Sequence, residues 1–156
     1  EGTGRAYFGD HIEGDVKTTD FGDYTASDAA LKSLSYPLAK HITKLNKIRR
    51  AVPALQKGQY TVDSNYVSGD MAYIRRYTSD DTDSLALVTI SSAATFKNIP
   101  NGTYIDAVTG DTKVVTNGTL SVSAPGKSNM RVYVCCGNGF TGIDGAIGST
   151  NLTYLK

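Results

Sequence analysis

The sequence predicts a mainly β fold, an antiparallel Greek-key-like β-sandwich of about eight strands, preceded by one βα unit. Three observations predict it. Residues typical of strands and turns are abundant, with 10 Tyr and 16 Gly among 156 residues. After Gly58, apolar residues alternate with a period of two or form short runs. Clusters of Gly, Pro, Asn and Asp separate these runs, as tight turns require.

The N-terminal part predicts one short strand and a long polar loop. Arg5 to Gly9 has the pattern of a buried strand, and the stretch from Asp10 through Ser27 is rich in Gly and Asp. A loop of this length without periodicity is usually functional or disordered. We therefore expect functional residues in this loop more than in the strand beside it.

Two helices are expected next. The first begins at Ser27 or Asp28, and Pro37 suits the first turn of the second, where its missing N–H costs nothing. Proline disfavours the helical conformation in the residue before it, so the second helix should end at Val52. One face of this helix carries an apolar stripe, made of Leu38, Ile42, Leu45, Ile48 and Val52.

His41 lies at the edge of this apolar stripe, and Arg49 lies almost inside it. Either residue could be a ligand or a binding group. We interpret His41 as a boundary histidine and Arg49 as a paired or snorkelling arginine.

The period-two pattern predicts the strands of the β-domain at residues 60–62, 71–77, 85–90, 95–99, 103–108, 112–115, 119–122 and 130–134. Turns are expected between them at residues 79–83, 100–102, 109–111, 117–118 and 125–127. The chain then divides into an N-terminal segment (1–56), an all-β domain (57–136) and a Gly-rich tail (137–156) that could add one further strand.

Charge and hydropathy disfavour nucleic-acid and membrane partners. The 16 Lys and Arg residues nearly balance the 15 Asp and Glu residues, and no basic stripe stands out. No apolar run approaches the roughly 20 residues that cross a bilayer. The N-terminus lacks the pattern of a signal peptide, so a signal for secretion would lie upstream.

Cysteine and metal-ligand patterns are sparse. Cys135 and Cys136 are neighbours and cannot staple distant segments, so we interpret them as ordinary thiols. A vicinal disulfide, or pairing with other sequence, is the alternative. The histidines fit no zinc pattern. Asp80, Asp81 and Asp83 lack the remaining ligands of a calcium loop, which favours a solvated hairpin tip and no metal site.

Motifs of nucleophilic or cofactor chemistry do not occur, and no catalytic residue is assigned to this chain. Three N-glycosylation sequons begin at Asn101, Asn117 and Asn151. The first two are also Asn-Gly pairs, which type I′ turns favour, and we interpret them as turns.

Three segments resemble the C-terminal end of α-amylase-type glycoside hydrolases. Residues 4–10 are similar to the last barrel strand of that family, with His11 where the family has Glu. Residues 36–58 are similar to its final helix, and the Pro-Ala-Leu sequence at 53–55 is the most specific match. Residues 102–110, with the segments 118–122 and 131–134, resemble its terminal β-domain and the Tyr-x-Asp-x-x-Thr-Gly hairpin.

This resemblance implies a parent enzyme that hydrolyses α-glucans in a (β/α)8 barrel, using a carboxylate nucleophile, a carboxylic general acid and a further carboxylate. Nothing in this chain aligns with those residues. The resemblance therefore implies the C-terminal fragment of a secreted, extracellular or cell-surface starch-degrading enzyme, inactive alone, whose β-domain stabilises the barrel. Its partners would be the missing N-terminal barrel and the α-glucan. The parent could hold calcium, whereas no cofactor is assigned here.

Barrel active sites lie at the C-terminal ends of the strands. The resemblance therefore places Asp10 and His11 at the substrate cleft of the intact barrel. The loop residues Asp20, Phe21 and Asp23 would be further candidates there. A single βα unit cannot close a barrel. We expect the N-terminal part either to self-associate through its exposed remnant or to pack back on the β-domain.

Two other functions fit parts of the sequence. A non-catalytic carbohydrate-binding domain would stack exposed tyrosines such as Tyr60, Tyr66 or Tyr73 on sugar rings, although the chain has no Trp. A cell-surface or adhesive β-domain would explain the Thr- and Gly-rich tail. It would not explain the helix and its Pro-Ala-Leu ending.

Overall fold

The computed structural model describes residues 16–17, 25–26 and 28–136. The chain divides into two compact units, Glu1–Lys44 and Leu45–Lys156. In the first unit, β1 (Val16–Lys17) pairs antiparallel with β2 (Thr25–Ala26), within the stretch expected to be a loop. The expected strand at 5–9 lies outside the described residues.

Three helices follow: α2 (Asp28–Ser35), α3 (Pro37–Ala51) and α4 (Pro53–Lys57), with α3 spanning the division between the units. The expected start at Pro37 and stop before Pro53 are confirmed. Val52 has extended backbone angles, φ −123 and ψ 103, as the residue before a proline prefers. The sequence did not predict α4, because Pro53 was interpreted only as a stop.

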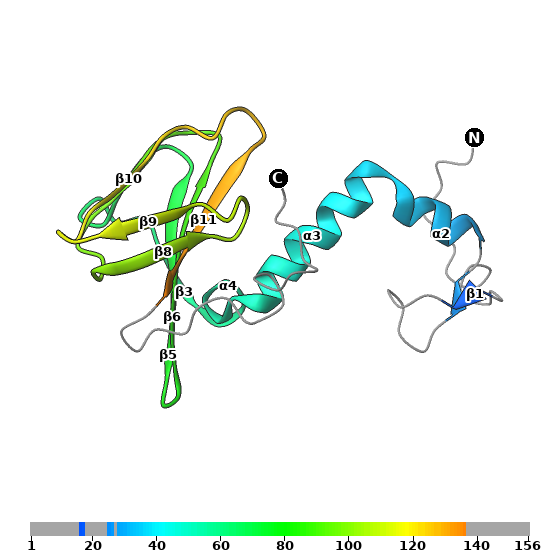
Figure 1. Ribbon diagram of the computed structural model, residues 1–156, viewed down its shortest axis with the longest axis horizontal. Helices are drawn as coiled ribbons and strands as arrows, with labels where there is room; N and C mark the ends of the chain where they lie inside the picture. Colours follow the sequence, from blue (N-terminus) through cyan, green and yellow to red (C-terminus); the bar gives the residue numbers. More distant parts are fainter. Residues whose placement is uncertain (1–15, 18–24, 27, 137–156) are drawn as a thin grey trace. The chain divides into compact units, whose positions relative to one another are not determined.

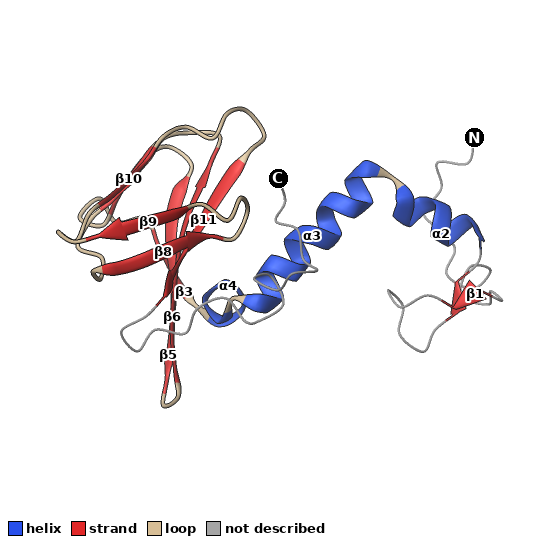
Figure 2. Ribbon diagram, viewed as in Figure 1, coloured by secondary structure: helices blue, strands red, loops and turns tan. Residues whose placement is uncertain are grey.

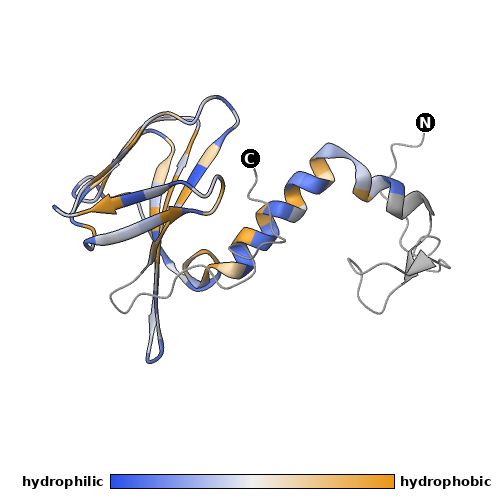
Figure 3. Cartoon of the chain, in the orientation of Figure 1, coloured by the Kyte–Doolittle hydropathy of each residue, from blue (hydrophilic) through white to orange (hydrophobic). Residues whose placement is uncertain are grey.

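The apolar stripe of α3 is buried only toward its C-terminal end. Ile48 is 5% exposed and Val52 is fully buried, whereas Leu38 is 70% and Ile42 is 49% exposed. Figure 3 shows hydrophobic and hydrophilic residues alternating along this helix. The helix is therefore amphipathic over its whole length but covered over only part of it.

Two antiparallel sheets form the second unit, which confirms the mainly β class (Figures 1 and 2). The larger sheet has six strands, in the spatial order β3 (Gln59–Thr61), β5 (Ala72–Ser79), β6 (Thr82–Ile90), β11 (Met130–Cys136), β8 (Gly102–Asp106) and β9 (Thr112–Val115). The smaller sheet has three, in the order β10 (Leu120–Val122), β7 (Ala94–Phe96) and β4 (Val67–Ser68).

Each of the eight strands expected between Gly58 and Val134 has a counterpart, with three differences. The two-residue strand β4 was not predicted. The strand expected at 95–99 ends at Phe96, since Asn98 adopts a left-handed φ of 52° that interrupts extended structure. The turn expected at 79–83 is tighter, because Ser79 and Thr82 still pair across β5 and β6. The further strand considered for the tail lies outside the described residues.

The alternation of side chains places a hydrophobic cluster on each face of the six-stranded sheet. On β11, Tyr133 and Cys135 join the cluster that also contains Phe96 of the smaller sheet. Val132 and Val134 point to the opposite face, where they join Val52 and other residues of α3 and α4. Both faces are covered along residues 132–135, which is why Val, Tyr, Val and Cys follow one another without a charged residue there.

Candidate functional site

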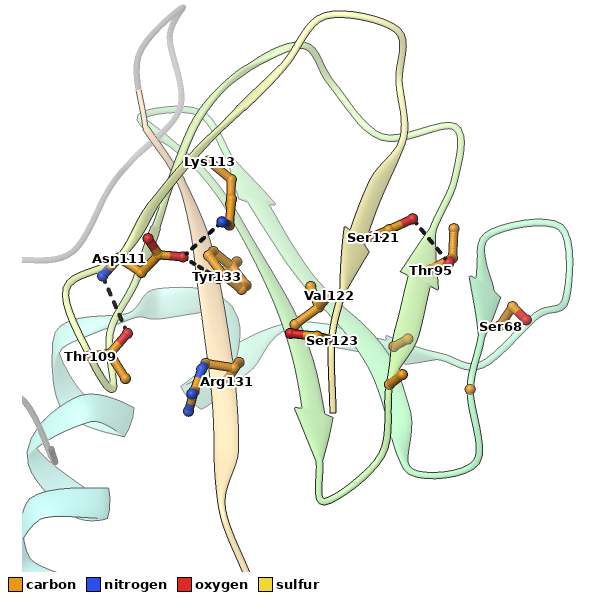
Figure 4. A pocket seen from close by; sticks show the side chains of 13 residues that line it. Ser68, Thr95, Thr109, Asp111, Lys113, Ser121, Val122, Ser123, Arg131 and Tyr133 are labelled. Atoms are coloured by element: carbon orange, nitrogen blue, oxygen red, sulfur yellow. Dashed lines mark hydrogen bonds and ion pairs between the residues drawn. The ribbon is translucent and has the colours of Figure 1, made fainter. Parts of the chain in front are cut away.

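A polar cleft of about 880 Å³ lies between the two sheets (Figure 4). One wall comes from the β8–β9 connection, β9 and β11, which contribute Asp111, Lys113 and Tyr133. The facing wall belongs to the smaller sheet, where the hydroxyl oxygens of Thr95 and Ser121 lie 3.2 Å apart. The cleft thus combines charged groups on one side with hydroxyl groups on the other.

Asp106 lies fully buried beneath the charged wall and organises it. Its Oδ1 accepts hydrogen bonds from the backbone N–H groups of Val108 (3.1 Å) and Val132 (2.8 Å). Its Oδ2 accepts one from Thr109 Oγ1 at 2.5 Å and lies 3.5 Å from Arg131 Nε. Asp106 therefore joins the Tyr-x-Asp-x-x-Thr-Gly hairpin to β11.

Asp111 is the exposed carboxylate of the cleft. The Tyr133 hydroxyl donates to its Oδ2 at 2.7 Å, and Lys113 Nζ lies 3.3 Å from the same atom. The Tyr133 hydrogen bond, with a smaller contribution from Lys113, lowers the pKa of Asp111. Burial, followed by the interactions with Asp111, raises the pKa of Tyr133. These groups are paired as carboxylate, ammonium and neutral phenol.

Asp106 and Asp111 do not match the carboxyl pair of a glycosidase. Asp106 is fully buried, and each of its oxygens already has partners within the chain. Asp111 has a lowered pKa, whereas the general acid of a glycosidase needs a raised one. The arrangement suits the stabilisation of a hairpin better than proton transfer.

The residues considered as metal ligands lie on exposed or paired positions. Asp80 and Asp81 are exposed at the β5–β6 turn, and Asp83 binds the guanidinium of Arg76 through both oxygens, at 3.0 and 2.8 Å. Within the described ranges, no group of three or more His, Cys, Asp or Glu side chains could hold a metal ion.

Of the tyrosines considered for sugar stacking, the structure brings Tyr60 and Tyr73 together. Their ring centroids lie 5.2 Å apart with the planes at 42°. Tyr60 is 59% exposed and Tyr73 is half-buried. Tyr66 is also exposed, but it precedes β4 of the smaller sheet.

A recess of about 490 Å³ lies beside Tyr60, at the point where β3 begins. It is lined in part by Lys57, Gln59, Arg76 and Tyr77, and we call it the β3 recess. Lys57 Nζ lies 5.5 Å from the ring centroid of Tyr77. Of the residues that line the recess, the sequence pointed only to Tyr60. Tyr77 could have been found from its alternation with Tyr73 and Arg75 along one strand.

The remaining predicted site residues lie either outside the description or on α3. Asp10, His11, Asp20, Phe21 and Asp23 lie outside the described residues. His41 and Arg49 are exposed on α3, and Arg49 forms no ion pair within the part of the chain that the structure describes.

Cys135 is fully buried on β11. The side chain of Cys136 is outside the description.

The two Asn-Gly pairs lie at bends, and neither forms the expected type I′ turn. That turn requires positive φ at both central residues. Gly118 has a φ of 70°, but Asn101 and Asn117 are not among the residues with positive φ. Instead, Asn101 Oδ1 accepts the N–H of Gly118 at 2.8 Å, so the two Asn-Gly segments lie side by side.

No protein-family model matches the chain, and the search of curated proteins found no match either. Among the helices that the structure describes, none has the length and apolar character needed to cross a membrane.

Proposed function

We propose that the chain is the C-terminal part of a secreted α-glucan-degrading glycoside hydrolase. In this proposal, residues 1–56 are the last βα segment of a catalytic barrel, and the two sheets form a Greek-key-like sandwich that stabilises it. The proposal rests on the resemblance of the sequence segments and on the packing of the helical connection. The chain itself carries no catalytic carboxylate, so it is inactive alone.

The packing of the last turn of α3 and of α4 against the six-stranded sheet carries this proposal. Val52 and Ala54 are fully buried there, in one cluster with Ala86 and Val88 of β6. The backbone N–H of Ala54 donates to the buried Ser84 Oγ at 3.0 Å. Burial of this apolar surface, together with a buried hydrogen bond, holds the helical connection on the sheet. This is the arrangement that a barrel-supporting domain needs.

Earlier residues of α3 supply surface for the proposed partner. Leu38 and Ile42 of α3, and Tyr36 just before the helix, are each about half exposed or more. Clusters of apolar side chains on one helix face are typical of surfaces that another element covers. In the proposal, the rest of the barrel covers them. Asp10 and His11 then contact substrate only in the intact barrel.

The coding sequence upstream of Glu1 tests this proposal. It should continue in frame into a (β/α)8 barrel that contains a nucleophilic carboxylate, a carboxylic general acid and a further carboxylate. Calcium ligands and a secretion signal are also expected there. An upstream region that encodes no such barrel would refute the proposal.

Carbohydrate binding is a second candidate function, because Tyr60 and Tyr73 form an exposed aromatic pair. Aromatic faces stack on the apolar faces of sugar rings. Affinity electrophoresis in gels containing polysaccharide tests it. Retardation of the chain that Tyr60→Ala abolishes would support binding, and unaltered migration in every polysaccharide gel would exclude it.

A further inference from the structure

We infer that the face formed by Tyr60, Tyr73 and Arg75, which we call the tyrosine face, binds a sugar chain that carries anionic groups. A phosphate ester or a carboxylate on the sugar would supply the charge. This inference rests on the proposed carbohydrate-binding function and specifies its ligand.

The pairing of β3 with β5 builds the tyrosine face. Tyr60 is directly opposite Arg75 in the register, and Tyr73 is two residues from Arg75 on the same face of β5. Tyr60 is 59% exposed, so most of its ring is available for stacking. The Tyr73 ring packs against the Tyr60 ring, with 5.2 Å between the two ring centroids. The pair is a platform held in place by adjacent strands.

Arg75, beside the two tyrosines, has a hydrogen-bond donor, Nε, without an acceptor among the described residues. This Nε is buried. Its guanidinium lies close enough to the Tyr73 phenol to counteract part of the rise that burial causes in the pKa of Tyr73. A buried donor without an acceptor is unfavourable, and an anionic oxygen makes the stronger, charge-assisted hydrogen bond.

The adjacent β3 recess adds positive charge. Lys57 and Arg76 line it, and no carboxylate does. Asp83 neutralises Arg76 from outside the lining, through a bidentate pair. Lys57 Nζ lies 5.5 Å from the ring centroid of Tyr77, which is on the same face of β5 as Arg75. Gln59 is the register partner of Arg76, so both point to the face of the sheet opposite Tyr60 and Arg75, and Lys57 is the recess cation that serves the tyrosine face. A neutral glucan would stack on the tyrosines but would not use the cations.

Single-stranded nucleic acid also combines rings with negative charge, and aromatic and basic side chains together can bind it. The charge of the whole chain disfavours that ligand. The formal net charge is only +1, with 15 acidic residues against 16 basic ones. Proteins that bind nucleic acid usually present an extended basic surface. An anionic sugar needs only the local charges of Lys57 and Arg75.

Affinity electrophoresis of the whole chain tests the inference. The gels would contain phosphorylated amylopectin, the same polymer after removal of its phosphate, polygalacturonate, or single-stranded DNA. We expect retardation by phosphorylated amylopectin, polygalacturonate or both, and at least tenfold weaker affinity for dephosphorylated amylopectin. The responsive polymer identifies the source of the charge.

Substitutions locate the site. Tyr60→Ala should weaken affinity for the anionic polymer at least tenfold, whereas the matched control Tyr66→Ala, at an exposed tyrosine outside the site, should leave it unchanged. Arg75→Gln should reduce the affinity to that for the neutral polymer. Lys57→Ala, at an exposed side chain, should weaken binding severalfold even if Arg75→Gln fails to fold, which far-UV circular dichroism would show.

Three results would overturn the inference. Equal retardation by amylopectin with and without phosphate, and none by polygalacturonate, would remove the anionic ligand but leave the carbohydrate-binding function standing. Unaltered migration in every polysaccharide gel would remove both. Tighter binding of single-stranded DNA than of either anionic polysaccharide would assign the tyrosine face to nucleic acid.

Discussion

Asp106 is the residue on which the hairpin between β8 and β9 depends most. The carboxylate accepts two buried backbone N–H groups and one hydroxyl, and it lies beside the guanidinium of Arg131. Its removal leaves several of these donors without a partner, away from water. Substitution of Asp106 alone should therefore lower the free energy of unfolding by an unusually large amount.

We predict that Asp106→Ala lowers the free energy of unfolding by about 3–5 kcal/mol, the range found when one partner of a buried charged pair is removed. Urea unfolding measures it. Asp111→Asn, at an exposed carboxylate five residues away on the same hairpin, is the matched control and should cost less than about 1 kcal/mol. Equal effects of the two substitutions would show that Asp106 is not the organising residue.

Tyr133 gives the chain a predictable response to alkaline pH. Its pKa is raised in the folded protein, so the phenol stabilises the fold fully below its unfolded pKa of about 10. That stabilisation is lost as the pH rises through the higher folded value. We predict that Tyr133→Phe lowers stability by about 1 kcal/mol at pH 7.

The same variant should lose less stability than the wild type above pH ~10. Thermal unfolding at a series of pH values from neutral to strongly alkaline measures both curves. If both proteins lost stability equally as the pH rises, the alkaline loss of stability could not be assigned to Tyr133. Tyr104 and Tyr73, whose pKa values burial also raises, contribute to the alkaline loss that remains in the variant.

Sequence reasoning found several of these residues without finding their roles. The Tyr-x-Asp-x-x-Thr-Gly pattern drew attention to Asp106 only as a family resemblance. Its contacts with Val132 and Arg131 join positions that are 26 residues apart or nearly so, and local spacing cannot predict such contacts. Arg75 was missed for a similar reason, because only the pairing of β3 with β5 places it opposite Tyr60.

Among the elements, α3 offers an internal comparison. Ile48 is 5% exposed in the cluster with β6 and β11, whereas Ile42 is 49% exposed on the same helix. We predict that Ile48→Ala lowers the free energy of unfolding by about 2–5 kcal/mol through loss of burial and a residual cavity. Ile42→Ala, the matched control, should cost well under half as much. Urea unfolding of both variants measures the difference.

Comparable destabilisation by the two isoleucine substitutions would mean that the helix is covered along its full stripe. The apolar stripe itself was predictable from the sequence, because helical periodicity shows which residues share a face. Its partial burial was not. Periodicity identifies an apolar face but does not say which part of it a partner covers.

The strands were predictable where alternation extends over several residues, as in β5, β6 and β11. The two-residue strand β4 carries too short a pattern to be seen. At β7 the apolar Ile99 extended the predicted strand, but the left-handed backbone of Asn98 separates it from Phe96. Backbone conformation at single residues therefore sets boundaries that hydropathy cannot.

At the scale of the whole molecule, the exposed part of α3 leads to a prediction about association. Leu38 is 70% exposed, an unfavourable position for a large apolar side chain in a cluster of others. We predict that the chain self-associates with rising concentration, and that Leu38→Glu shifts it toward the monomer. Size-exclusion chromatography with light scattering measures this.

A monomer at every concentration would contradict that prediction. Leu38→Glu should not alter the unfolding of the β-domain, because Leu38 lies outside the buried clusters. A loss of stability in that variant would instead show that the N-terminal part packs back on the β-domain.

We propose that the end of α3, α4 and the six-stranded sheet form one structural unit. Native-state hydrogen exchange of the whole chain tests it most directly. The account predicts that the amides of Ile48, Ala51 and Val52 exchange only through the same global unfolding that exposes β6 and β11. Fast exchange at these helical amides, while the sheet stays protected, would contradict it.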